Sequence, residues 1–326
     1  MTMMIKFLAS FSFLVASTSA FVVAPQNLAY QKSGTVVASK SSLRATPADA
    51  IAQVDVSQQS SVNAIVAAIP DLAPKPDFSW TPQDGVTIGG APATLDARDA
   101  PGPANIAWLS ALNIAGKESS LTIFNGPLTN VPHLLSRVCV INDNTLSFAL
   151  DFRPRAYGAY EMKNPATGEY PGPEELGRQA FEYSGNRKEF ETNFGNEEVT
   201  TFLESAKASF EGAMDSNEGN SEIEKLVKGP LAMSVTMPLT DGNVAAIAAA
   251  REKAAAYWLQ WATDGAHEHR PGAPVNTQYV YDTKYKINAY EALLSTYTQF
   301  YGPDDGAKLA AAECGPLDEA YVGGAS

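Results

Sequence analysis

Two segments of alternating apolar and polar residues, joined by a short turn, constrain the fold of this chain more than any other feature. Residues 132–141 and 145–152 place apolar side chains at every second position, and a period of two predicts β-strands. Between them, Asn142-Asp143-Asn144 are residue types that tolerate the backbone of a tight turn. The two segments therefore predict an antiparallel hairpin.

The two faces of this hairpin differ in character. If Ile141 faces Thr145, the register pairs Cys139 with Ser147, Arg137 with Ala149, Leu135 with Asp151, and His133 with Arg153. The face that should pack against helices is almost wholly apolar: Leu134, Ser136, Val138, Val140, Leu146, Phe148, Leu150 and Phe152. The opposite face mixes charged residues with small ones: His133, Leu135, Arg137, Cys139, Ile141, Thr145, Ser147, Ala149, Asp151 and Arg153. Small residues beside charged ones favour a ligand pocket, and the alternative is an ion pair between Arg137 and Asp151 beside solvent.

The rest of the chain predicts a mixed fold. Strand patterns occur at 107–114, 119–124 and 231–237, and helical spacing occurs at 174–191, 196–214, 244–262 and 278–300, with a short helix after 302. Residues 49–104 are expected to form an irregular N-terminal arm, with a loose helix at 49–68 and many Pro and Gly afterwards. We therefore expect an antiparallel β-sheet between helices, an α/β/α sandwich, over residues 105–326.

The N-terminus predicts a targeting leader. The first 48 residues contain no Asp or Glu, and an apolar run at 7–16 is followed by small residues up to Ala20. This is typical of a signal peptide over 1–20, and the basic, Ser-rich stretch 21–48 is typical of a transit peptide. Together they predict import into a secondary plastid and its stroma. The alternative is plain secretion.

Composition excludes several functions. Without the leader, 19 basic residues stand against 36 acidic ones, a net charge near −17, which disfavours nucleic-acid binding. No later segment approaches 18 unbroken apolar residues, so no integral membrane segment is expected after the leader. The two cysteines cannot hold a cysteine-ligated iron–sulfur cluster, and no nucleotide-binding glycine motif is present. His267 and His269 have no identifiable third ligand, so no metal site is expected.

Three segments together resemble the red chlorophyll catabolite reductase family, which is related to the ferredoxin-dependent bilin reductases. The first runs from Leu121-Thr-Ile-Phe-Asn-Gly to Val131-Pro-His-Leu-Leu-Ser-Arg137, and the second is Leu146-Ser-Phe-Ala-Leu-Asp-Phe-Arg-Pro-Arg155. The third comprises Gly229-Pro-Leu-Ala-Met-Ser-Val, Tyr257-Trp-Leu-Gln-Trp261 and Tyr297-Thr-Gln-Phe-Tyr-Gly302. The resemblance covers residues 105–313 and depends on order and pattern.

The resemblance implies an α/β/α sandwich with a tetrapyrrole between the sheet and the C-terminal helices. It also implies no bound cofactor, since reduced ferredoxin supplies electrons and side chains or water supply protons. The chain departs from the family at its acids: the family's catalytic Glu falls at Arg137, and an acidic loop position falls near Tyr157. The acid of the last helix falls near Glu291 or Ala292. Because Arg cannot donate a proton at neutral pH, other acids must act or catalysis is lost.

The resemblance thus implies ferredoxin-dependent reduction of a linear tetrapyrrole, which we expect to be a red chlorophyll catabolite in chlorophyll breakdown. The candidates for the proton-donating side chain are Asp151, His133 and Asp282. The candidates for substrate contacts are Arg137, Arg153, Arg155, Tyr157, Lys284, Lys286 and Asn288, although the cluster on the last helix, taken alone, is more typical of a solvated face. Two alternatives remain: a tetrapyrrole carrier or scaffold without catalytic acids, and an assembly factor whose sheet docks a partner. A homodimer is left open.

Overall fold

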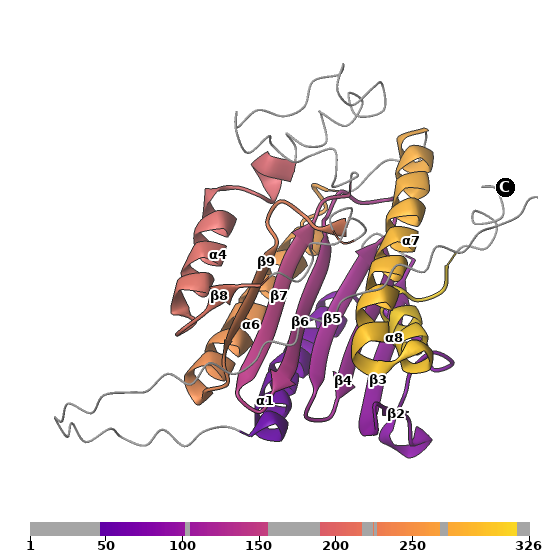
Figure 1. Ribbon diagram of the computed structural model, residues 1–326. Helices are drawn as coiled ribbons and strands as arrows, with labels where there is room; N and C mark the ends of the chain where they lie inside the picture. The colour runs from indigo at the N-terminus through magenta and orange to yellow at the C-terminus, as the bar shows by residue number, and fades with distance from the viewer. Residues whose placement is uncertain are drawn as a thin grey trace, which may run out of the picture. The chain divides into compact units, whose positions relative to one another are not determined.

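A nine-stranded antiparallel sheet with the order β1-β3-β4-β5-β6-β7-β9-β8 organises the structure, and β2 pairs with β3 outside this path. The computed structural model describes residues 46–101, 105–155, 190–216, 224, 227–267 and 273–317, without the side chains of 273–277 and 280. The long strands β3 to β7 follow one another as a meander (Figure 1). Their bounds are Ala91–Ala100 for β3, Ile106–Ile114 for β4, Glu118–Asn125 for β5, His133–Asn142 for β6 and Thr145–Arg153 for β7.

Shorter strands complete the sheet at both edges. The strand predicted at 231–237 is β9, Met233–Pro238, which lies between β7 and β8, Met214–Asp215. At the other edge, β1, Ala73–Pro74, pairs with β3, as does β2, Thr87–Ile88. A 3₁₀ helix, Pro82–Asp84, precedes β2. The predicted antiparallel meander is therefore confirmed and extends further than expected on both sides.

The register of the β6–β7 hairpin agrees with the prediction at all but one pair. Arg137 faces Ala149, Leu135 faces Asp151, and Cys139–Ser147 and His133–Arg153 also pair as expected. The predicted pairing of Ile141 with Thr145 is wrong, because a β-bulge brings Asn142 opposite Thr145. The Asn142 side chain accepts a hydrogen bond from the Asn144 backbone N–H at 2.9 Å, which tightens the turn.

Helices cover both faces of the sheet, so the predicted α/β/α sandwich is confirmed. The apolar hairpin face, including Val138 and Phe148, packs against α1, Pro47–Ala68, and α6, Asp241–Thr263. Helix α4, Glu197–Ser209, joins the same apolar cluster. On the opposite face lie α7, Ala273–Tyr301, and α8, Pro303–Cys314 (Figure 1). The close approach of α8 to α7 requires glycine at 306, where a Cβ would lie 2.7 Å from the Thr298 backbone nitrogen.

The helix expected at 49–68 is confirmed as α1, whereas the expectation of an irregular arm over the rest of 49–104 is wrong. Helix α1 buries Ile51, Val54 and Ile65 in the core, and Thr46 caps its first turn. Strand β3 pairs with β4 over most of its length and buries Ala93, Leu95 and Ala97. Most prolines of this region lie in the connection between α1 and β3, outside the long strands. Pro92 lies at the start of β3, where proline is tolerated. This region belongs to the sandwich. Most of the helix predicted at 174–191 lies outside the described residues.

A buried polar network joins α1 and α6 to the sheet. Arg251 of α6 is 3% exposed and donates hydrogen bonds to Ser119 Oγ at 3.0 Å and to Gln58 Oε1. Gln58 of α1 in turn donates to the Leu112 carbonyl at 3.2 Å. Burial lowers the pKa of Arg251 to about 10, and Asp55 opposes this shift. These bonds satisfy buried polar groups that would otherwise destabilise the layer.

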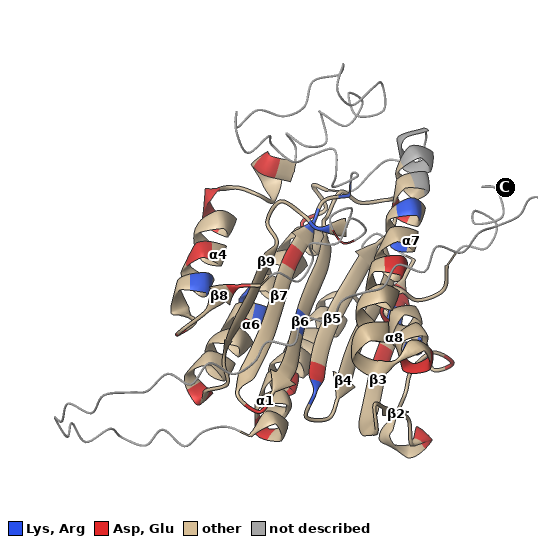
Figure 2. Cartoon of the chain, viewed as in Figure 1, with Lys and Arg blue, Asp and Glu red and all other residues tan. Residues whose placement is uncertain are grey.

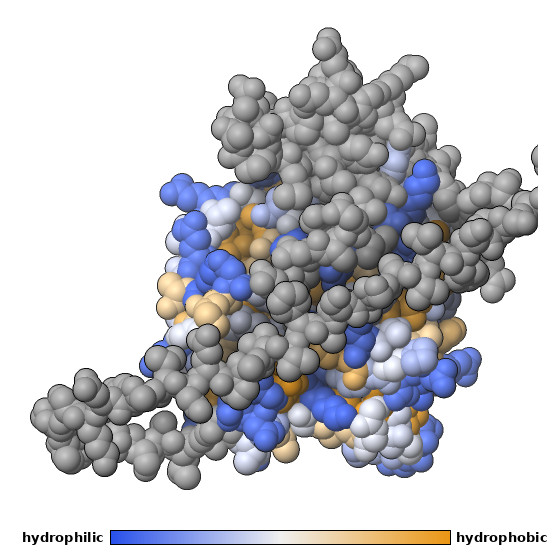
Figure 3. Space-filling view, in the orientation of Figure 1, coloured by the Kyte–Doolittle hydropathy of each residue, from blue (hydrophilic) through white to orange (hydrophobic). Residues whose placement is uncertain are grey.

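Charge and hydropathy are distributed by layer. Few charged positions lie on the strands at the centre of the sheet, whereas the helices carry many (Figure 2). On the face shown in Figure 3, hydrophilic residues lie over α4 and α8 at the two sides, with apolar residues visible between them. Among the described helices, none has a stretch that is both apolar and long enough to cross a membrane.

Candidate functional site

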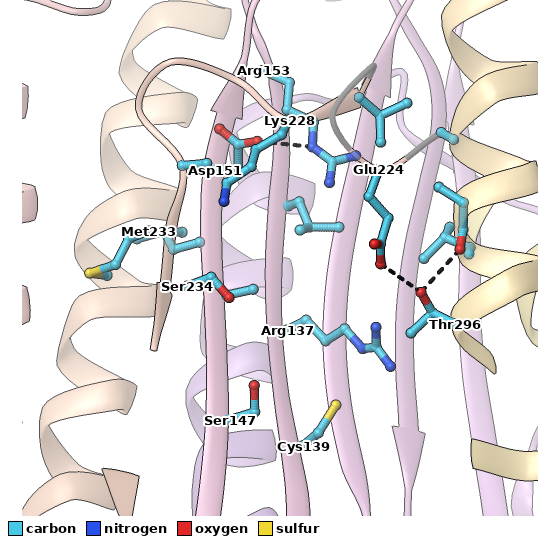
Figure 4. A pocket seen from close by; sticks show the side chains of 18 residues that line it. Arg137, Cys139, Ser147, Asp151, Arg153, Glu224, Lys228, Met233, Ser234 and Thr296 are labelled. Carbon is cyan, nitrogen blue, oxygen red and sulfur yellow. Dashed lines mark hydrogen bonds and ion pairs between the residues drawn. The ribbon is translucent and has the colours of Figure 1, made fainter. Parts of the chain in front are cut away.

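The mixed face of the β6–β7 hairpin opens into a cavity between the sheet and α7, here called the slot. It encloses about 120 Å³, and Figure 4 shows its side chains. The hairpin contributes Leu135, Arg137, Cys139, Ser147, Ala149, Leu150, Asp151 and Arg153. The opposite walls come from Glu224, Val227, Lys228, Ala232, Met233 and Ser234, and from Ala289, Ala292, Leu293 and Thr296 of α7. The slot therefore lies on the face where the sequence predicted a pocket.

Asp151 is the acid of the slot. The residue is 3% exposed, and Oδ2 accepts hydrogen bonds from Arg153 Nε at 3.1 Å and from the Gly229 backbone N–H at 2.9 Å. Oδ1 has no hydrogen-bond partner among the described residues. Burial raises the pKa of Asp151, and Arg153 and the Gly229 N–H oppose the shift without cancelling it. A carboxyl with a raised pKa can hold a proton for transfer at a higher pH than an ordinary Asp.

Cationic side chains surround this acid at one end of the slot. Arg153 pairs with Asp151 and also bonds the hydroxyl of Tyr285. Tyr285 donates to the Val227 carbonyl at 2.7 Å, which fixes the segment carrying Lys228 above the strands. In Figure 4, Lys228 runs beside Asp151. Two cations beside one buried acid favour the binding of anionic groups at this end.

Arg137 lies further along the slot, and residues of β5 and α7 hold its side chain in place. Its Nε donates to Glu118 Oε1 at 2.8 Å, and its guanidinium lies 4.5 Å from the ring centre of Tyr297. The alternative of an Arg137–Asp151 ion pair is therefore wrong, since each residue has another partner. In Figure 4 the Arg137 side chain runs toward α7. Arg137 lines the slot, where a substrate contact was predicted. The carboxylate that it binds in this structure is that of Glu118, which belongs to the protein itself.

His133 and Asp282 belong to a second cavity of about 140 Å³, also lined by Phe124, Asn125 and Lys286. Nδ1 of His133 accepts from the Asn125 backbone N–H at 3.0 Å, which assigns its hydrogen to Nε2. Nε2 lies 4.0 Å from Asp282 Oδ1. Burial, together with Arg155, Arg153 and Lys286, lowers the pKa of His133 well below its usual value. His133 is thus neutral near pH 7, and the structure does not bring it into the slot with Asp151.

Arg155 and Asp282 brace the fold instead of lining the slot. Arg155 donates to both Asp282 oxygens, to the Thr129 carbonyl at 2.8 Å and to the Gly126 carbonyl at 2.7 Å. Burial raises the pKa of Asp282, while Arg155 and Gln278 oppose the shift. Arg155 is 6% exposed, and most of its N–H groups donate hydrogen bonds within the protein.

The remaining predicted contacts are dispersed. Lys286 donates to the Pro316 carbonyl at 2.7 Å and lines the second cavity, where burial lowers its pKa. Lys284 and Asn288 are half-buried on α7 and line neither cavity. Tyr157 lies outside the described residues. Within the described ranges, no three or more His, Cys, Asp or Glu residues are grouped so that they could hold a metal ion.

Sequence reasoning missed Glu118, Glu224 and Lys228, and it placed Tyr285 in the polar cluster of the last helix without making it a candidate site residue. Glu118 is 0% exposed. Its position directly before an apolar strand pattern is the sequence signal that could have indicated a functional acid. Glu224 accepts a hydrogen bond from Thr296 at 3.0 Å at the side of the slot. Lys228 and Tyr285 reach the site from segments far from the hairpin in sequence, so no local pattern indicates their partners.

Comparison with known proteins gives a fold similarity and no close relative. No protein-family model matches the chain, and no curated protein matches it. Among solved structures, the chain is similar to phytochromobilin synthase from tomato, solved in complex with biliverdin. The two share 13% identity with a TM-score of 0.49, and the match covers 82% of this chain and 86% of the tomato protein. At this identity, residue roles do not transfer from one protein to the other.

Proposed function

We propose that the slot binds a linear tetrapyrrole, and that the protein reduces it with electrons from ferredoxin and a proton from Asp151. The observation that carries the proposal is the carboxyl of Asp151, buried in the slot with a raised pKa and one oxygen without a partner in the described structure. The order of sequence segments that resembles red chlorophyll catabolite reductases supports the same substrate class. We take the pigment to be a red chlorophyll catabolite.

The shape of the slot supports an extended, flat ligand. Its lining runs from Ser147 to Arg153 along β7, which at about 3.3 Å per residue spans about 20 Å. The enclosed 120 Å³ is below the ~300–1,000 Å³ of most small-molecule pockets. A tetrapyrrole would therefore occupy the slot with part of its length and extend beyond the described walls. Arg137, Arg153 and Lys228 are the groups in the slot that suit its carboxylates.

The chemistry assigned to the chain is proton supply and positioning. Reduced ferredoxin delivers one electron at a time, and each double bond reduced consumes two electrons and two protons. Asp151 supplies one of these protons from its raised-pKa carboxyl and water supplies the other, and Arg153 and the Gly229 N–H then stabilise the carboxylate that remains. Ferredoxin as donor, and the lack of any bound cofactor, are part of the proposal.

A non-catalytic carrier is the second candidate, and Arg137 is the observation that favours it. The resemblance places the family's catalytic Glu at this position, where the chain has a guanidinium bound to Glu118. A protein that retained the slot but lost this acid could bind the pigment without reducing it.

Spectroscopy distinguishes the two candidates. Purified protein is mixed with biliverdin and, separately, with a red chlorophyll catabolite, and then with a ferredoxin-reducing system. A reductase shifts the absorption on mixing and then bleaches or shifts it again on reduction, whereas a carrier gives only the first change. Absence of any shift with both pigments would overturn tetrapyrrole binding.

Asp151→Asn tests the acid. We expect binding to persist and turnover to fall about 10²–10⁴-fold, the usual contribution of a positioned proton donor. Asp143→Asn is the matched control, since it makes the same change at an exposed position of the same hairpin and should leave turnover unchanged. Turnover that is equal in both variants would show that Asp151 is not the donor.

The leader supports a place of action, which we propose to be the stroma of a secondary plastid. A fluorescent protein fused after residue 48 should reach the plastid of an alga with secondary plastids. Deletion of residues 21–48 should leave it in the secretory route.

A further inference from the structure

A buried cluster beneath Arg137 contains two carboxyl groups and one cation. Glu118 of β5, Glu313 of α8 and Tyr297 of α7 are each 0% exposed. The Tyr297 hydroxyl lies 2.7 Å from Glu118 Oε1 and also 2.7 Å from Glu313 Oε1. A phenol has one hydrogen and can donate to only one of these oxygens. The second short contact therefore requires a hydrogen on a carboxyl.

The contacts of the two acids decide which one carries this hydrogen. Glu118 accepts from Arg137 Nε at 2.8 Å and from the Tyr301 hydroxyl at 3.0 Å, so it has a cation and suits the ionised form. Among the described residues, the Glu313 carboxyl contacts hydroxyl groups: Ser120, Thr122 and Tyr297. Burial raises the pKa of Glu313, Arg137 opposes the shift, and Glu118 adds to it. Geometry and charge thus place the proton on Glu313.

The cluster adjoins the slot through Arg137. This guanidinium lines the slot and binds Glu118, and Cys139, the cross-strand partner of Glu118, lines the slot as well. Tyr297 follows Thr296, which belongs to the slot wall. The other titratable groups nearby are Lys117, whose Nζ lies 5.8 Å from the Tyr301 ring centre, and the neutral Tyr301 hydroxyl. A ligand carboxylate that draws Arg137 away would leave Glu118 without its cation.

We propose that Glu313 stores a proton in the resting protein and that Arg137 couples this store, through Tyr297 and Glu118, to an anionic ligand in the slot. When the ligand takes Arg137, Glu313 gives its proton to the Tyr297 oxygen while Tyr297 gives its own to Glu118. Glu118 becomes neutral, Glu313 becomes ionised, and Tyr297 is unchanged. Glu313 then takes up one proton from solvent, so both acids end neutral. Tyr297 and Glu313 are positioning residues, and the coupling to a tetrapyrrole rests on the function proposed above.

Infrared spectroscopy on the full-length protein tests the store without any ligand. At neutral pH, the carbonyl band of a buried protonated glutamic acid, separated by ¹³C-glutamate labelling from any aspartic acid band such as that of Asp151, should be present in the wild type and lost in Glu313→Gln. It should remain in Glu252→Gln, which removes an exposed carboxyl from α6. Arg137→Gln should increase the band about twofold, because Glu118 loses its cation. Protein labelled with ¹³C-glutamate assigns the band to glutamic acid and needs no substitution. A wild type without a ¹³C-sensitive band would overturn the store.

The coupling is tested with biliverdin as probe. Binding is followed by absorption, and the infrared band is followed in the same sample. Binding with growth of the band supports the coupling, and binding with an unchanged band overturns it while leaving tetrapyrrole binding intact. Absence of binding counts against the proposed function, and the ligand-free comparison of wild type, Glu313→Gln and Arg137→Gln still decides whether the store exists.

Discussion

The backbone N–H of Gly229 donates a hydrogen bond of 2.9 Å to the carboxylate of Asp151. This contact fixes the segment before β9 against the end of β7. It requires glycine, because a Cβ at position 229 would lie 2.6 Å from Asp151 Oδ1 and 3.1 Å from the Phe152 carbonyl oxygen. The slot and its acid are therefore positioned by a backbone group as well as by Arg153.

Gly229→Ala should destabilise the protein by about 1–3 kcal/mol, the usual cost of forcing an added methyl into a packed site. Urea unfolding measures the change. Gly242→Ala is the matched control, since a Cβ there meets only Thr240 Oγ1 at 3.9 Å and the position is helical. The control should be neutral or slightly stabilising, and equal effects in the two variants would contradict the close contact at Gly229.

Glu313→Gln should change how stability depends on pH. A buried acid with a raised pKa binds its proton more tightly in the folded than in the unfolded state. Wild-type stability should therefore fall relative to Glu313→Gln as pH rises above the ordinary carboxyl range, by up to about 1.4 kcal/mol per pH unit, until the raised pKa is passed. Unfolding free energies of both proteins from pH 4 to pH 8 measure this. A constant difference across that range would show that Glu313 is not protonated in the folded protein.

Arg155→Lys should lower stability without changing ligand affinity. Lysine cannot reproduce the fork to both Asp282 oxygens together with the bonds to two backbone carbonyls, and we expect a loss of about 2–4 kcal/mol. Arg98→Lys, at a partly exposed pair with Asp96, should cost less than about 1 kcal/mol. Biliverdin titrations complete the test. A stable Arg155→Lys protein with weakened binding would restore Arg155 as a ligand contact.

The two cysteines should differ in reactivity. Cys139 is half-buried in the slot, whereas Cys314 is buried and burial, with Glu313, raises the pKa of its thiol to about 12. At pH 8 only about 10⁻⁴ of such a thiol is ionised, against a sizeable fraction for an ordinary cysteine. Iodoacetamide should modify Cys139 before Cys314, as followed by peptide mass mapping. Cys139→Ser should abolish this fast phase of the modification. Labelling of both thiols at one rate would contradict this assignment.

The hairpin was predictable because its pattern is local. The period of two and the turn residues placed Arg137 opposite Ala149 and Asp151 opposite Leu135, as the structure has them. The bulge at Ile141 was not predictable, because it depends on the Asn142 side chain bonding a backbone N–H within the turn. Strand β3 was missed because its sequence follows a proline-rich connection, and its strand character becomes evident only beside β4.

The site was predictable only where strand alternation decides it. Asp151, Arg153 and Arg137 share the predicted face and line the slot. His133 shares that face but lines the second cavity with residues of α7, and the direction in which α7 crosses the sheet is not encoded in the hairpin. Glu118 and Glu313 are 195 positions apart in sequence and meet through packing alone. No spacing rule indicates such a pair.

Neighbouring residues at the start of β5 point into different helix layers. Glu118 faces α7 and α8 through Tyr297, whereas Ser119 faces α1 and α6 through Gln58 and Arg251. One peptide unit thus anchors buried polar groups on both sides of the sheet. If either helix layer unfolded alone, a charged group or a hydroxyl of this strand would lose its hydrogen-bond partner. The strand would then be destabilised, and with it the packing of the other helix layer. We therefore expect thermal unfolding of the sandwich to be a single cooperative event, which calorimetry would check.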